Sequence, residues 1–180
     1  MRGSRRVSYR EVTGWPIWIL LLIWVSCVGG GLALLAPASE ILRESGGVGA
    51  DVGKMVLLFI LGGIVILMPL LFQLFWGGLV VEVSPDELTV TFGRLRWPTK
   101  RIAFDDVTAM EAVTYRPIRE FGGWGIRFAG GGKSAWTTRG SKALKVEAKD
   151  GKTVYVGSDK PERLLSRIAA AAGHRYEWAS

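Results

Sequence analysis

The sequence predicts a membrane helical hairpin joined to an α+β domain, in which an antiparallel β-barrel or bent sheet of seven or eight strands is capped by a C-terminal helix. Three observations predict this fold class. Two long runs near the N-terminus are apolar, residues 77–180 carry short alternating segments, and one amphipathic helical pattern follows them. The predicted organisation is a basic tail at 1–14, a membrane region at 15–76 and a domain at 77–180.

The apolar runs are residues 15–36 and 55–76, and neither contains a charged side chain. A helix needs about 20 apolar residues to cross ~30 Å of hydrocarbon, because each residue adds only ~1.5 Å. Both runs are therefore predicted to be transmembrane helices, joined by a short external loop. Glycines 29–31 and 62–63 would allow the two helices to approach each other closely.

The charges beside the two runs predict their orientation. Arginines and lysines flank the membrane region on one side, while the loop at 37–54 carries more acidic than basic residues. The flanking cations are Arg2, Arg5, Arg6 and Arg10 before the first run, and Arg94, Arg96, Lys100 and Arg101 after the second. The positive-inside rule then predicts a multi-pass protein with both termini in the cytoplasm.

A cleaved signal peptide is the alternative for the first run. The chain starts with the basic sequence MRGSRR, and Ala36-Pro37-Ala38 has the spacing of a cleavage site. The apolar run is longer than the ~7–15 residues of a usual signal peptide, so a retained helix is favoured.

After residue 77 the pattern changes to short segments rich in β-branched and aromatic residues, separated by turn formers. The predicted strands are 79–84, 87–92, 101–104, 107–115, 124–128, 134–138, 143–148 and 153–156. Between the last two, Asp150-Gly151 predicts a two-residue type I′ hairpin turn. Asp159 is then predicted to cap the final helix, with Pro161 in its first turn. Its apolar stripe comprises Leu164, Leu165, Ile168, Ala169 and Ala172.

The composition argues against an enzyme. The chain has one Cys and one His, so a disulfide within the chain is excluded and His174 would have to serve in any His-dependent scheme. Asp105, Asp106 and Glu111 could suggest a metal or acid–base site, but a solvated turn explains them better. We therefore expect no catalytic residue, no metal and no cofactor.

Residues 131–134 (GGKS) imitate the end of a phosphate-binding loop. The first glycine of that motif would fall on Arg127, and a strand rather than a helix is predicted to follow. A hairpin turn is therefore predicted at this position.

Two stretches of the sequence are specific: YRPIREFGGWGIR at 115–127 and GSDKPERL at 157–164. With these stretches and its order of elements, nearly the whole chain resembles an uncharacterised family of bacterial membrane proteins, which have two transmembrane helices and a C-terminal pleckstrin-homology-like (PH-like) domain. The resemblance implies a PH-like fold and a location in the cell inner membrane, and it implies no reaction.

The segment 115–127 also predicts a site for a protein partner or for another copy of the chain. Arginine and aromatic side chains in a connection are typical of binding loops. The candidate partner-binding residues are Arg116, Arg119, Phe121, Trp124 and Arg127. The alternative is a structural loop in which Phe121 and Trp124 plug the end of the barrel.

A second hypothesis is recognition of anionic lipid head groups, because the domain carries a basic cluster soon after the membrane region. The candidate lipid-binding residues are Arg94, Arg96, Trp97, Lys100 and Arg101. Lysines of the later strands and helix, Lys145, Lys149, Lys152 and Lys160, are the matched set expected to matter less. The alternative is scattered charge that keeps the domain soluble. No nucleic acid partner is expected, since the formal charge of +7 has no recognition helix or aromatic platform beside it.

Overall fold

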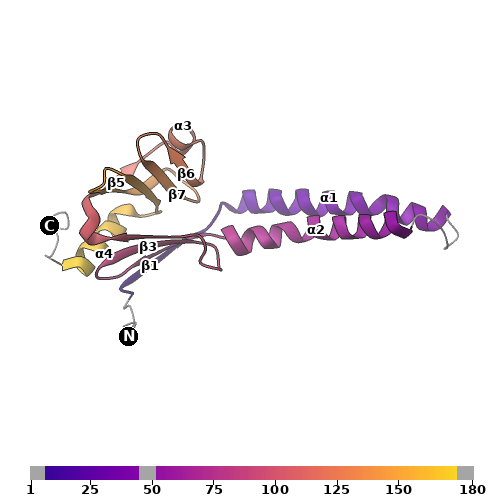
Figure 1. The fold of residues 1–180 in the computed structure, drawn as a ribbon, viewed down its shortest axis with the longest axis horizontal. Helices are drawn as coiled ribbons and strands as arrows, with labels where there is room; N and C mark the ends of the chain where they lie inside the picture. The colour runs from indigo at the N-terminus through magenta and orange to yellow at the C-terminus, as the bar shows by residue number, and fades with distance from the viewer. Residues whose placement is uncertain (1–6, 45–51, 174–180) are drawn as a thin grey trace. The chain divides into compact units, whose positions relative to one another are not determined.

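The computed structural model describes residues 7–44 and 52–173 of the chain (Figure 1). The chain divides into two compact units. The helix unit comprises Pro16–Leu74, and the sheet unit comprises Met1–Trp15 together with Phe75–Ser180.

The helix unit contains α1 (Ile17–Glu44) and α2 (Val52–Trp76). Stretches Ile17–Pro37 and Gly53–Phe75 are long and apolar enough to cross a membrane. Only 6% and 11% of the residues in their most apolar windows are buried, which is the opposite of the core helix of a soluble protein. Both helices extend beyond the predicted spans, so the predicted loop at 37–54 is reduced to residues 45–51, which lie outside the described residues.

Glycine allows the two helices to pack against each other. A Cβ added to Gly31 would lie 2.4 Å from Ile66 Cγ1 and 3.1 Å from the carbonyl oxygen of Gly62. A Cβ added to Gly62 would lie 2.9 Å from Leu35 Cδ2. The expected close approach at these glycines is therefore present, because the backbones meet where neither helix has a side chain.

The first sheet of the sheet unit has the order β1-β2-β3-β4, and all three pairings are antiparallel. Its strands are β1 (Tyr9–Thr13), β2 (Leu79–Val83), β3 (Glu87–Phe92) and β4 (Thr99–Ala103). β1 lies in the segment that the sequence analysis assigned to a tail. Two membrane-length helices therefore separate β1 and β2, which are neighbours in one sheet.

Hydrogen bonds also tie β1 to the second half of the domain. The Ser158 hydroxyl and the Asp159 backbone N–H donate to Glu11 Oε1, at 2.7 and 3.1 Å. The Thr138 hydroxyl donates to the carbonyl oxygen of Thr13, at 3.1 Å and in a buried position. β1 is therefore an integral strand of the sheet unit.

The second sheet corrects the prediction of an all-antiparallel barrel. Its order is β5-β8-β9-β7-β6, and β7 runs parallel to β9. The strands are β5 (Val107–Thr114), β6 (Gly125–Ala129), β7 (Lys133–Thr137), β8 (Lys142–Ala148) and β9 (Thr153–Gly157). Within the described residues the two sheets share no strand ladder, so the barrel is not closed. The GGKS turn joins β6 to β7 as an antiparallel hairpin, as predicted.

Short helical elements complete the sheet unit: η1 (Phe104–Asp106), α3 (Pro117–Phe121) and α4 (Pro161–Ala172). The inner faces of both sheets and one side of α4 form a common hydrophobic core. Fully buried core members include Phe92, Phe104, Leu144, Leu164 and Ile168. The amphipathic C-terminal helix is confirmed, because its 3.6-residue periodicity places Leu164, Ile168 and Ala172 on the buried side.

Two local predictions were wrong. The residue that caps α4 is Lys160, whose backbone N–H donates to the Ser158 hydroxyl, while the Asp159 carboxylate pairs with Arg139. The β8–β9 turn is not type I′, since Gly151 has a positive φ of 79° and Asp150 does not. Gly151 N–H donates to the carbonyl of Ala148 at 2.9 Å, which makes a longer turn that needs one glycine.

Candidate functional site

The β3–β4 turn is exposed at one end of the first sheet. Leu95 and Trp97 are 50% and 63% exposed, and Arg94 and Arg96 are exposed beside them. The Gly93 N–H donates to the carbonyl of Gly78 at 2.8 Å, so the turn lies beside the residues that lead into β2. Because Thr13 pairs with Leu79, β1 ends at this same end of the sheet. The turn therefore lies at the sheet end from which the chain continues into α1 and α2.

A basic face covers the outer side of the first sheet. Arg10, Glu82, Thr89 and Arg101 form one row across its four strands. Arg10 Nε lies 3.7 Å from the Glu82 carboxylate, which also pairs with Arg96. We define the basic face as Arg10, Arg94, Arg96 and Arg101. The sequence analysis missed Arg10 as a binding residue, because only the pairing of β1 with β2 brings it here.

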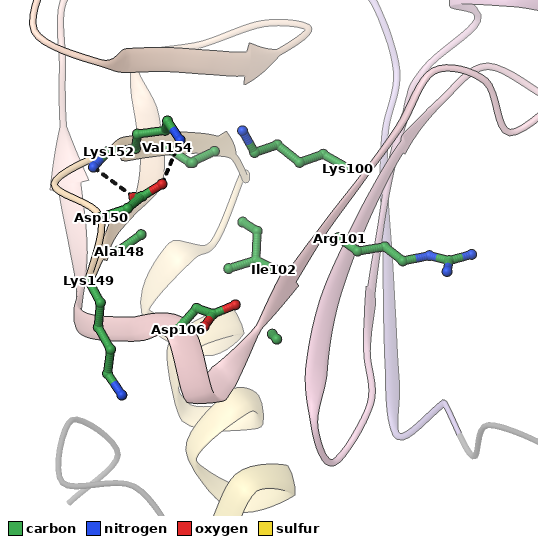
Figure 2. Close-up of a pocket in the computed structure, with 10 residues that line it drawn as sticks. Lys100, Arg101, Ile102, Asp106, Ala148, Lys149, Asp150, Lys152 and Val154 are labelled. Carbon is green, nitrogen blue, oxygen red and sulfur yellow. Dashed lines mark hydrogen bonds and ion pairs between the residues drawn. The ribbon is translucent and has the colours of Figure 1, made fainter.

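Lys100 does not belong to the basic face. It lies opposite Val90, a fully buried residue, whereas Arg101 lies opposite Thr89. Alternate residues of a strand point to opposite faces of the sheet. Figure 2 shows the Lys100 and Arg101 side chains extending in opposite directions. The structure thus separates Lys100 from Arg94, Arg96 and Arg101 of the basic face. Trp97 lies in the exposed turn, where its ring packs edge-on against Phe75 with centroids 6.5 Å apart.

Lys100 instead lines a cavity of about 420 Å³ between β4 and the β8–β9 turn (Figure 2). We call it the lysine cavity. It is lined by Lys100, Arg101, Ile102, Ala103, Asp106, Ala148, Lys149, Asp150, Lys152 and Val154. Burial lowers the pKa of Lys100, and the charge of Lys152 lowers that pKa further, while Asp150 opposes the shift. Lys149 and Lys152, which the sequence analysis placed in the control set, therefore share a site with Lys100.

A second hollow, of about 390 Å³, lies beside α3, and we call it the α3 groove. It is lined by Tyr115, Arg116, Pro117, Ile118, Arg119, Trp124, Gly140 and Ser141. Ile118 is 69% exposed, and Arg116 and Arg119 are exposed on either side of it in the sequence. The groove thus combines an apolar surface with two cations.

The predicted partner-binding residues have different environments. Phe121 is only 8% exposed and packs with Tyr115 and Tyr155, with ring centroids 6.0 and 5.1 Å away. Trp124 is half-buried, and its Nε1–H donates to the carbonyl of Gly140 at 2.9 Å. Arg127 is exposed and donates through Nε to the Trp124 carbonyl at 3.1 Å. Phe121 is therefore a core residue, as the structural alternative for this loop expected.

Two hydroxyl groups are buried beneath α3. Burial raises the pKa of Tyr115, and the Thr137 hydroxyl opposes that shift. The geometry between them does not make a hydrogen bond: among the described residues, neither Tyr115 OH nor Thr137 Oγ1 has a partner. A buried hydroxyl without a partner is destabilising, so these two groups contribute less to stability than hydrogen-bonded hydroxyls would.

The acidic candidates do not gather into a site. Asp105 and Asp106 lie in η1, and Glu111 lies on β5 opposite Lys145. Across residues 7–44 and 52–173, no three His, Cys, Asp or Glu side chains lie close enough to hold a metal ion. His174 lies outside the described residues.

Comparison of the chain with protein-family models, with curated proteins and with solved structures found no match. The candidate sites of the sheet unit are therefore argued from their own geometry.

Proposed function

We propose that the protein is a non-enzymatic, membrane-anchored binding module with a PH-like sheet unit, and that it docks a protein partner in the α3 groove. The observation that carries this proposal is the exposure of Ile118 between two exposed arginines, Arg116 and Arg119, on a loop whose aromatic side chains are buried or half-buried. Charge complementarity favours a partner segment that carries acidic side chains around one apolar side chain.

Packing and hydrogen bonds hold the residues of the groove in place. Phe121 and Tyr115 anchor α3 in the second hydrophobic cluster, and Trp124 is held by Gly140. Glu120 accepts a hydrogen bond from the Arg116 backbone N–H at 2.7 Å, which closes the short helix. Binding to a preformed surface loses less conformational entropy than binding to a mobile loop, and the groove therefore favours recognition.

The proposed topology places both termini of this inner-membrane protein in the cytoplasm. The pairing of β1 with β2 supports it, because strands on either side of two membrane spans can pair only if both lie on the same side. The basic residues before α1 and after α2 favour the cytoplasmic side. Signal-peptide cleavage near Ala38 would remove β1 from the sheet, so the pairing also supports a retained α1. An active alkaline phosphatase fused after Ser180 would contradict this topology.

The docking test uses the full chain in mild detergent. The variant Arg116→Glu/Arg119→Glu should lose the protein that co-purifies with the wild type, because both cations at the groove are reversed. The control Lys160→Glu/Arg163→Glu reverses two exposed charges on and beside α4 and should retain the partner. Equal loss from both variants would contradict docking in the groove. Capture of a second copy of the chain would identify self-association as the interaction.

Anionic lipid is a second candidate, favoured by the place of the β3–β4 turn at the sheet end where β1 ends and β2 begins, the points at which the chain connects to α1 and α2. The exposed Leu95 and Trp97 could enter the headgroup layer, while Arg94 and Arg96 contact phosphates. A fluorophore on Leu95→Cys, in a Cys27→Ser background, should shift to the blue in nanodiscs that contain phosphatidylserine. Arg94→Gln/Arg96→Gln should remove this shift, and Lys160→Gln/Arg163→Gln should keep it. A probe that responds equally in neutral nanodiscs would contradict the lipid hypothesis.

A further inference from the structure

The lysine cavity lies where the two sheets come together without sharing a ladder. One wall is the edge strand β4, through Ile102 and Ala103, and the other is the β8–β9 hairpin, through Ala148 and Val154. The volume of about 420 Å³ is within the usual range for small-ligand sites, ~300–1,000 Å³. The apolar walls lower the local dielectric constant, which strengthens any charge interaction inside the cavity.

Lys100 is a cation of this cavity that lacks an ion-pair partner among the described residues. The lining contains four cations, Lys100, Arg101, Lys149 and Lys152, and the two carboxylates of Asp106 and Asp150. Asp150 already accepts from Lys152, with Nζ and Oδ2 2.6 Å apart. Within the part of the chain that the structure describes, Lys100 makes no ion pair. In Figure 2 the Lys100 and Lys152 side chains extend toward the same space, whereas Lys149 and Arg101 extend away from it.

We propose that the lysine cavity binds the phosphate group of an anionic ligand between Lys100 and Lys152. A phosphate monoester carries about −1.5 to −2 charges near pH 7 and has three strong acceptor oxygens. It can therefore pair with the Lys100 ammonium, which has no ion-pair partner among the described residues, and accept a further hydrogen bond from Lys152, whose ammonium has three donors and also pairs with Asp150.

The environment of Lys100 agrees with this geometry. Its pKa is lowered first by burial and second by Lys152, which means that the empty cavity disfavours the charged ammonium. A bound anion opposes both effects, because its negative charge stabilises the ammonium form of Lys100. Titratable groups that line the same space are Asp106, Lys149, Asp150 and Lys152.

This inference is independent of the proposed docking in the α3 groove and of the basic face. Lys100 and Arg101 are consecutive residues of β4, and their side chains point to opposite sides of the sheet. A variant of Arg101 therefore changes the net charge equally while it leaves the Lys100–Lys152 pair in place. It is the matched control.

The phosphate can come from a soluble phosphorylated molecule or from a lipid head group, and one measurement separates them. The full chain is acylated with an amine-reactive reagent, and mass spectrometry follows the labelling rate of each lysine. In the first arm, inorganic phosphate is titrated into the chain in maltoside detergent. In the second arm, the chain is placed in phosphatidylcholine nanodiscs with or without phosphatidic acid.

Phosphate should slow the labelling of Lys100 and Lys152 saturably, while Lys145 and Lys160 label at unchanged rates. In Lys152→Gln, an exposed change that does not touch the core, the concentration that protects Lys100 should rise about tenfold or more. Arg101→Gln should leave that concentration within about twofold. Lys100→Gln, with its fold checked by circular dichroism, should likewise abolish the protection of Lys152.

Protection by inorganic phosphate identifies a soluble phosphate as a sufficient ligand. Protection only in phosphatidic acid nanodiscs identifies the lipid head group. The inference is overturned if neither arm protects Lys100, or if Arg101→Gln weakens protection as much as Lys152→Gln does, because net charge alone would then explain it.

Discussion

Removal of β1 should strongly destabilise the sheet unit, although the shortened chain still contains the sequences of all the other strands and of α4. The comparison uses two soluble proteins: residues 77–180 alone, and residues 7–14 joined to residue 77 by a linker of about four residues. Such a short linker suffices because Thr13 pairs with Leu79. The joined protein keeps every strand of both sheets, while the shorter one leaves the edge of β2 without its partner.

The magnitude follows from the contacts of Glu11 and Thr13. Glu11 Oε1 accepts from Ser158 and from Asp159, and the Thr13 carbonyl accepts from Thr138. A hydrogen bond to a charged group contributes about 1.5–3 kcal/mol and a neutral one about 0.5–1.5 kcal/mol. Since the Asp159 bond is exposed, the expected loss is about 3–5 kcal/mol, a large part of the ~5–15 kcal/mol of a typical domain.

Urea unfolding followed by tryptophan fluorescence measures this difference. The joined protein should unfold cooperatively at a clearly higher urea concentration than residues 77–180. Within the joined protein, Glu11→Ala should lower the free energy of unfolding by about 2–4 kcal/mol, whereas Arg10→Ala on the outer face of the same strand should change it by less than about 0.5 kcal/mol. Equal midpoints for the two soluble proteins would refute the argument that β1 is integral to the fold.

Three further predictions test the packing. Gly31→Val should lower the free energy of unfolding of the α1–α2 hairpin by about 1–3 kcal/mol in detergent, as measured by thermal unfolding. Gly30→Ala should have little effect, because a Cβ added at Gly30 meets no atom within 4 Å. Ile168→Ala should cost about 2–4 kcal/mol in urea unfolding, because this fully buried side chain joins α4 to the core. Burial raises the pKa of Tyr115 above its ordinary value near 10, so the stability that this group contributes is present below pH ~10 and is lost as the pH rises through the folded pKa. Tyr115→Phe should make this alkaline loss shallower without lowering stability at pH 7, and a stability loss of about 2 kcal/mol at pH 7 would show that the hydroxyl has a partner.

Features encoded in local periodicity could be predicted from the sequence. Uninterrupted apolar runs predicted α1 and α2, alternating segments predicted β2 through β9, and the 3.6-residue stripe with Pro161 predicted α4. Each of these signals lies within the element that it predicts, because the buried face of a helix or strand needs apolar side chains and the exposed face needs polar ones. For the basic and aromatic segments, the sequence showed only which residues are close together along the chain, so the candidate binding residues were grouped on that basis.

Only the tertiary structure shows which of these residues lie on the same surface. β1 has only five residues, and its partner lies beyond both long helices, so no local pattern marks Arg10 and Glu11 as sheet residues. The register of β4 separates Lys100 from Arg101, and packing of the two sheets brings Lys100 to Lys152 of a distant hairpin. The sequence by itself determined α1, α2, β2 through β9 and α4, because their periodicities are local, but it did not determine β1 or α3. The pairing of strands and the composition of the lysine cavity depend on contacts between distant segments, whose free energy is set only when the core packs.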